Sequence, residues 1–108
     1  MNGNEASANK TVNITTNGIT SIPVPANPTQ KLVLVRVIVN TKGGTGANAT
    51  IYDSNDTLGA DGLLRKAILD TVNTLGNVEY GFPFFSGIYI VTGNGTPANL
   101  TIVYKETP

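Results

Sequence analysis

Short runs of alternating apolar and polar residues, separated by glycine and proline, extend along most of this sequence. Val12 and Ile14 alternate with threonine and asparagine before an Asn-Gly turn signal at 17–18. Towards the other end, Leu100, Ile102 and Tyr104 alternate with threonine, valine and lysine. A period of two over such a length is typical of a half-buried strand. The turn signal further predicts that residues 19–24 form a hairpin with the first strand.

The same pattern predicts about eight short antiparallel strands. Valine, isoleucine and threonine supply 34 of the 108 residues, and this β-branched content favours strands over long helices. Glycine and proline between the apolar runs indicate tight turns, as in sandwiches, jelly rolls and barrels. We therefore expect an all-β β-sandwich or jelly-roll-like domain. The expected strands cover residues 10–16, 19–24, 31–40, 47–53, 63–72, 78–80, 88–92 and 100–105.

Two of these regions carry conflicting or restrictive signals. In residues 63–72, Leu64, Ile68 and Val72 fit a helical stripe, whereas the apolar residues between them also fit a strand. We expect a strand, because the neighbouring segments are all β. Residues 23–29 contain three prolines, which cannot donate to a strand ladder, so an edge or a connecting loop is expected there.

The segment 31–40 is the strongest predicted strand, and both of its faces are apolar. Val33, Val35 and Val37 alternate with leucine, arginine and isoleucine. One face can line the core, but the other also requires cover. That cover is either a loop of the same chain or a neighbouring subunit, which makes these three valines candidate contacts with a partner.

All three phenylalanines lie in one proline-containing segment, residues 81–87. Phe82, Phe84 and Phe85 are bracketed there by glycines, which predicts a loop. Such a concentration of large apolar groups fits either a plug that closes one end of the sandwich or an anchor that inserts into a neighbouring protein. The three phenylalanines are therefore added to the candidate contacts.

Composition narrows the classes of function. The chain is long enough for one domain, carries a formal net charge of +0, and has only 13% charged residues, against about 25% in an average soluble domain. So little surface charge protects poorly against association and suits a protein that contacts other proteins. Histidine and cysteine are absent, which excludes cysteine or histidine nucleophile chemistry and the commonest metal ligands. We expect a binding protein without cofactors rather than an enzyme.

Partners other than protein are not indicated. The basic residues are scattered and form no stripe that would neutralise several phosphates, so no nucleic acid partner is expected. No apolar run approaches the roughly 20 residues that cross a bilayer, so no membrane partner is expected either.

Two loops resemble ligand sites at first sight. Residues 42–46 are glycine-rich but are not followed by the lysine and helix of a phosphate loop, and we expect a hairpin turn. Asp53, Asp56 and Asp61 supply oxygen atoms that calcium accepts, although the spacing departs from the EF-hand template. The second loop is thus either a cation site or an ordinary Asx-rich turn.

Residues 1–9 are small and polar, with nothing to bury, and we expect a flexible N-terminal arm ahead of a domain over residues 10–108. Its polar residues, together with the lysine that follows, are candidates for ordering on a partner surface. They are Asn2, Asn4, Glu5 and Lys10.

The order of several segments resembles that of small β-sandwich proteins on the outside of tailed-bacteriophage heads, called cement or decoration proteins. The similarity covers about residues 30–105. It is carried by soft strand and turn patterns at residues 34–39, 50–54, 66–70, 81–90 and 97–104. The resemblance implies a homotrimer that binds the outer surface of the capsid, bridges neighbouring copies of the major capsid protein and stabilises the shell. It also implies a location in the virion, after assembly in the host cytoplasm.

A second interpretation is a head-fibre or tail-associated module that recognises the host through carbohydrate. The tyrosines provide rings that stack on sugars. They are Tyr52, Tyr80, Tyr89 and Tyr104. Binding to host cells would favour this interpretation, whereas binding only to capsids would favour the first.

Overall fold

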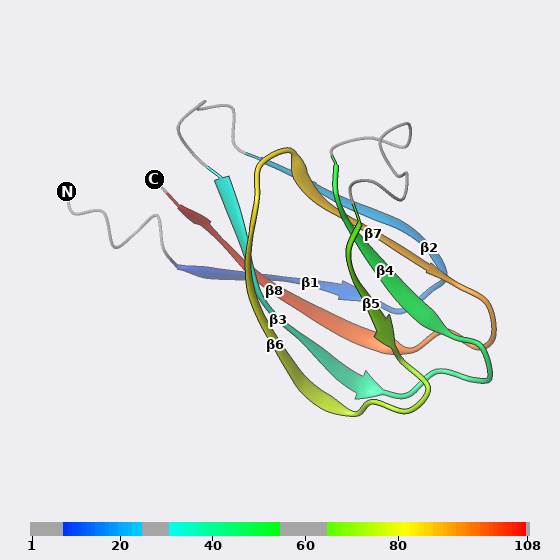
Figure 1. Cartoon of the computed structure of the whole chain (residues 1–108). Coiled ribbons are helices and arrows are strands. Elements are labelled where there is room, and N and C mark those ends of the chain that lie inside the picture. The colour runs from blue at the N-terminus through cyan, green and yellow to red at the C-terminus, as the bar shows by residue number, and fades with distance from the viewer. Residues whose placement is uncertain (1–7, 25–30, 55–64, 108) are drawn as a thin grey trace.

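Eight antiparallel strands account for all the regular secondary structure in the part of the chain that the structure describes. The computed structural model describes residues 8–24, 31–54 and 65–107 (Figure 1). The all-β sandwich expected from the sequence is confirmed. The strands are β1 (Asn9–Ile14), β2 (Gly18–Pro23), β3 (Lys31–Thr41), β4 (Asn48–Asp53), β5 (Arg65–Asp70), β6 (Gly76–Phe84), β7 (Gly87–Gly93) and β8 (Asn99–Thr107).

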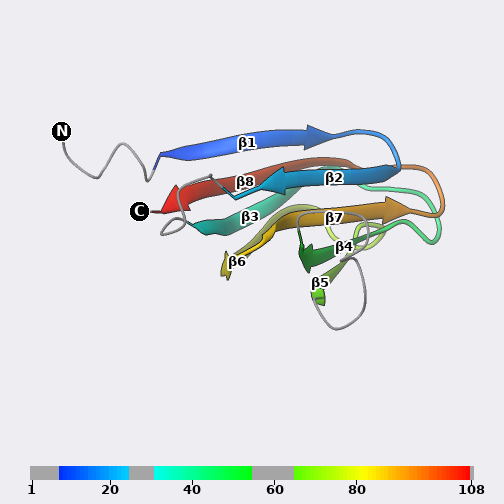
Figure 2. The ribbon, with the colours of Figure 1, turned by 90° about the horizontal axis from the view of Figure 1, so that it is seen from above.

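The strands form two four-stranded sheets in the orders β1-β8-β3-β6 and β2-β7-β4-β5. Figure 2 shows the same strands from above. Only β4 and β5 are both consecutive in the chain and paired with each other; the other connections pass from one sheet to the other. This strand order is that of a jelly roll, in which two sheets enclose one core.

The hairpin expected over residues 10–24 is wrong. Strand β1 pairs with β8, and β2 pairs with β7, so the turn at 15–17 carries the chain between sheets. Residues 42–46 do the same between β3 and β4 and are not a hairpin turn either. Turn residues indicate that the chain reverses, but they do not indicate whether the two flanking strands pair with each other. Ile14 and Ile22, on the two sides of the first turn, are both buried in the shared core, which each sheet covers from its own side.

A β-bulge at Val35 determines which face of β3 is buried. The register against both β6 and β8 shifts between Leu34 and Arg36. As a result, Leu34 and Val37 both point into the core, although strict alternation would place them on opposite faces. Val33 and Val35 are only partly buried and lie outside the core cluster. The bulge thus gathers apolar residues from both predicted faces onto one, and the outer face needs less cover than the sequence suggested.

Val37 must therefore be removed from the candidate contacts, because its side chain is 1% exposed and belongs to the core. The core is otherwise built from aliphatic side chains and one phenylalanine. Its fully buried large members are Leu32, Leu34, Ile51, Phe84, Ile88, Ile90, Leu100 and Ile102.

The ambiguous segment 63–72 contains a strand, β5, as expected, for the part that the structure describes. Leu69 is buried in the core, and Ala67 packs against it, whereas Ile68 between them is 58% exposed. This alternation is that of a strand with one buried face and one solvent-exposed face. Leu63 and Leu64 lie outside the described residues.

Strand β1 begins one residue before the predicted start of the domain. Lys10, which was grouped with the arm, lies within β1 opposite Tyr104, and its ammonium forms an ion pair with Glu106 at 3.0 Å. It is therefore a sheet residue. The three arm candidates Asn2, Asn4 and Glu5 lie outside the described residues.

The proline-rich segment behaves as expected where it is described. Pro23 is the last residue of β2, which is an edge strand of its sheet. The missing N–H of proline is tolerated at such a position.

Candidate binding surfaces

The turn between β6 and β7 divides the three phenylalanines between the core and the surface. Strand β6 extends to Phe84, so much of the predicted loop is strand. Phe84 is fully buried opposite Leu32 and closes the core, which removes it from the candidate contacts. Phe85, the next residue, is 66% exposed, and Phe82 is also exposed. Phe84 thus lies where a plug would, and Phe82 and Phe85 stay candidates for an anchor.

Asp53, at the end of β4, holds this turn by its carboxylate. Its Oδ1 accepts hydrogen bonds from the backbone N–H groups of Ser86 and Gly87, at 2.8 and 3.4 Å, and its Oδ2 accepts one from Phe85 at 3.1 Å. The backbone N–H of Ser54 also donates to the carbonyl oxygen of Gly87 at 3.0 Å. Three donors on one carboxylate fix the backbone on which Phe85 stands. We call Phe82, Pro83 and Phe85, together with the Asp53 carboxylate that holds the backbone, the aromatic turn.

The role of Asp53 changes the interpretation of the acidic loop. Both of its oxygens serve the aromatic turn, and Asp56 and Asp61 lie outside the described residues. Within residues 8–24, 31–54 and 65–107, no three aspartate or glutamate side chains are grouped so that they could hold a metal ion. No local pattern signals the bond between Asp53 and the turn, because the partners are more than thirty residues apart.

A second surface is the outer face of the sheet β2-β7-β4-β5. Its register places Ile19 opposite Val91, Val91 opposite Thr50, and Thr50 opposite Ile68. We call these four residues the apolar row, because it crosses the whole sheet without a charged residue. Ile19 and Ile68 at its two ends are 55% and 58% exposed.

The four tyrosines are divided between the core and the surface. Tyr89 is buried and meets Tyr52 edge to face, with ring centroids 6.2 Å apart. Tyr80 and Tyr104 pack against the core, and burial raises the pKa of Tyr80. Of the four, only Tyr52 lies outside the core and is also partly exposed.

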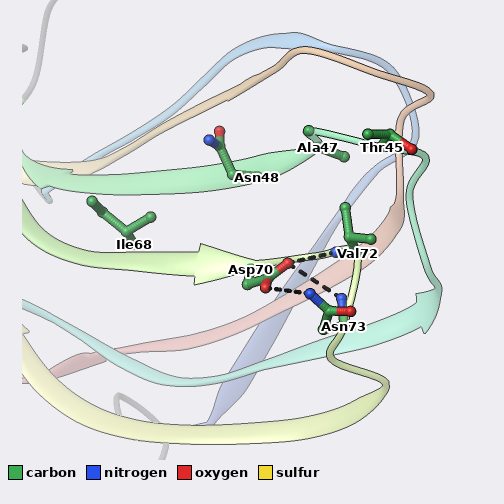
Figure 3. A pocket seen from close by; sticks show the side chains of 8 residues that line it. Thr45, Ala47, Asn48, Ile68, Asp70, Val72 and Asn73 are labelled. Carbon is green, nitrogen blue, oxygen red and sulfur yellow. Dashed lines mark hydrogen bonds between the residues drawn. The ribbon is translucent and has the colours of Figure 1, made fainter.

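A groove of about 470 Å³ lies beside the apolar row, where β4 begins and β5 ends (Figure 3). Asp70 and Asn73 line it together with Ile68 and Val72, so its wall is both polar and apolar. The remaining lining residues are Thr45, Gly46, Ala47 and Asn48.

Asp70 is committed to the turn that follows β5. Its Oδ2 accepts a hydrogen bond from the side-chain amide of Asn73 at 2.8 Å, and its Oδ1 accepts from the backbone N–H groups of Val72 and Asn73 at 2.9 and 3.2 Å. The side-chain bond from Asn73, followed by the two backbone bonds, lowers the pKa of Asp70 below its ordinary value of 3.8. The carboxylate is therefore ionised at neutral pH.

We expect the Asp70 carboxyl to titrate below 3.8 in an NMR pH titration of its side-chain carbon signal. Because the folded pKa is the lower one, Asp70 stabilises the fold above its unfolded pKa, and this contribution is lost as the pH falls through the folded pKa. Replacing Asn73 with alanine should move the midpoint upwards. An unchanged midpoint in that variant would contradict the hydrogen bond.

The other two carboxylates in the described part of the chain are also paired. Glu79 accepts a hydrogen bond from Nε of Arg36 at 2.8 Å on the outer face of β3 and β6, and Glu106 pairs with Lys10. Every carboxylate at a described position thus contacts a structural partner.

The described part of the chain also contains no helix of the length and apolarity that a membrane crossing requires.

No protein-family model matches the chain, and a search of curated proteins finds no match.

Proposed function

We propose that the protein is a structural component of a phage virion: it binds the outer surface of the capsid as a trimer and stabilises the shell by bridging neighbouring major capsid protein subunits. The observation that carries this proposal is the aromatic turn. A 66% exposed phenylalanine stands there on a backbone fixed by three hydrogen bonds.

Such a side chain suits adhesion to protein for two reasons. Large aromatic groups that enter a pocket of the partner dominate the binding energy of many interfaces. A residue that is already held in position also loses little conformational freedom on binding, so more of its contact energy appears as affinity. Val33 and Val35, partly exposed on the outer face of β3, stay in the set of candidate contacts with Phe82 and Phe85.

A trimer would multiply a modest contact. Once one copy is bound, the linked copies bind from a high local concentration, and the overall affinity exceeds that of one contact by about 10²–10⁴. A shell protein gains from this arrangement, because each copy can contribute a weak contact while the assembly stays attached.

We expect Phe85→Ala to weaken binding to undecorated capsids by about 2 kcal/mol per contact, or roughly thirtyfold. Co-sedimentation of purified protein with capsids measures this loss. Leu75→Ala is the matched control, because Leu75 is 62% exposed but lies in the turn between β5 and β6, at the other end of the sandwich (Figure 1). Both variants should unfold like the parent protein.

Equal binding by the Phe85 and Leu75 variants would contradict the role of the aromatic turn. Failure of the parent protein to bind capsids, together with binding to host cells or to a glycan array, would instead favour the head-fibre or tail-associated recognition module. The buried ring of Tyr89 gives that second function little support.

A further inference from the structure

Strand β5 is an edge strand with an unusual distribution of side chains. In the described part of the chain it pairs with β4 alone, so its second side has backbone groups that no described strand uses (Figures 1 and 2). An exposed edge of this kind is a template for another strand. The centre of β5 carries Ile68, 58% exposed and at one end of the apolar row.

The other edge strands carry features that oppose strand addition. Pro83 lies within β6, Pro23 ends β2, and Lys10 of β1 is held in an ion pair. Proline and charge on an edge are common devices against pairing. Strand β5 contains no proline. Its charged residues are Arg65, Lys66 and Asp70, and its register against β4 shifts at Lys66, so the regular part of the strand runs from Ala67 to Asp70.

The alternation of β5 restricts how a second β5 strand can pair with it. In an antiparallel pair, residues that lie opposite each other point to the same face of the sheet. Ala67 and Leu69 face the core, and Ile68 faces outwards. Under a two-fold axis at Ile68, Ala67 lies opposite the second copy's Leu69, so core-facing residues meet core-facing residues and the rule is satisfied.

The same register brings unlike charges together. It places Lys66 opposite Asp70 of the second copy, and the two-fold axis repeats this pair on the other side of Ile68. Lys66 and Asp70 are both exposed. In the described part of the chain Lys66 forms no ion pair, and Asp70 is held in position by Asn73. Opposite charges across a strand pair stabilise it, whereas like charges destabilise it.

We propose that β5 pairs antiparallel with β5 of a second copy of this chain across a two-fold axis at Ile68, so that two four-stranded sheets join into one of eight strands. Ile68 contacts Ile68 at the centre, and a Lys66–Asp70 pair flanks it on each side. Among the two-fold registers of β5 that keep core-facing residues opposite each other, only this one places an acidic residue opposite Lys66. The edge therefore selects its own copy.

This contact does not depend on binding to a capsid. A two-fold interface uses the same edge on both copies, so no free β5 edge is left to bind a third copy. The proposed trimer would use a different face. On a shell, the β5 contact would then link one trimer to the next. In solution, it makes the assembly even-numbered: a dimer, or a hexamer if the trimer also forms.

Sedimentation equilibrium of the full chain over a range of concentrations tests the proposal. We expect dimers or hexamers that dissociate on dilution. Ile68→Asp should raise the dissociation constant at least about tenfold, because it places two carboxylates face to face on the axis. Lys66→Asp should have an effect of the same size, and Lys66→Arg should have little.

The matched control is Ile19→Asp, at the opposite end of the apolar row and equally exposed. It should leave the association unchanged. A weakening equal to that of Ile68→Asp would show that copies meet through the sheet face, and it would overturn the edge contact. A monomer or a trimer at all concentrations would overturn it as well. Both isoleucines are exposed, so circular dichroism spectra of these variants should match those of the parent protein.

Discussion

Replacing Phe84 with alanine is expected to lower the free energy of unfolding by about 3–5 kcal/mol. The side chain is fully buried between the sheets, opposite Leu32 on the neighbouring strand, and its removal leaves a cavity that a rigid β core fills poorly. Domains are stable by only about 5–15 kcal/mol, so the loss is a large part of the total. Urea unfolding followed by circular dichroism measures it.

The adjacent residue supplies the control. Phe85 has the same side chain but is 66% exposed, and Phe85→Ala should change the free energy of unfolding by less than about 1 kcal/mol. A similar loss in both variants would show that the core does not separate the two rings. This pair of variants also reports the register of β6, since a slip by one residue would change which phenylalanine is buried.

Replacing Gly95 with alanine should cost about 2–4 kcal/mol, through backbone strain and steric overlap. Gly95 lies in the turn between β7 and β8 with φ at +61°, a conformation that residues with a β-carbon rarely adopt. An added β-carbon would also overlap the carbonyl oxygen of Thr45 and approach that of Gly44 to 3.0 Å. Both oxygens belong to backbone, which cannot rotate away. Thermal and urea unfolding would measure the loss.

Gly93 in the same chain reversal is the matched control. A β-carbon added there meets nothing within 4 Å, and its φ lies outside the left-handed region. Gly93→Ala should therefore be neutral or slightly stabilising, because alanine restricts the unfolded chain more than glycine. Equal losses at the two glycines would contradict the close packing of the β3–β4 turn against the β7–β8 turn.

The sequence predicted the strands well and their partners poorly. Alternation is a local property, so β1 and β8 could be found from residues such as Val12 and Ile102. Pairing depends on residues far apart, and an Asn-Gly turn fits both a hairpin and a connection between sheets. The bulge at Val35 was also out of reach, because no glycine of β3 marks it and its effect appears only in the registers of two partner strands.

The candidate surfaces show the same limit. The three phenylalanines were identified as a group, but only the pairing of Phe84 with Leu32 assigns one of them to the core. Asp53 was noted for its oxygens, and its function as the support of Phe85 required the two turns to meet in space. Ile68 looked like part of a helix or a strand. Its place at the centre of an edge follows only from the sheet order.

The jelly-roll order has a consequence for how the chain acquires its fold. Lys10 pairs with Tyr104, and β8 lies between β1 and β3, so the first sheet stays incomplete until residues 99–107 have emerged from the ribosome. Pairings between distant segments slow the search for the native state, which for such β proteins takes milliseconds to seconds. Over that interval the apolar strand β3 lacks the neighbour that later shields it, and dilution or a chaperone would improve the yield of refolding.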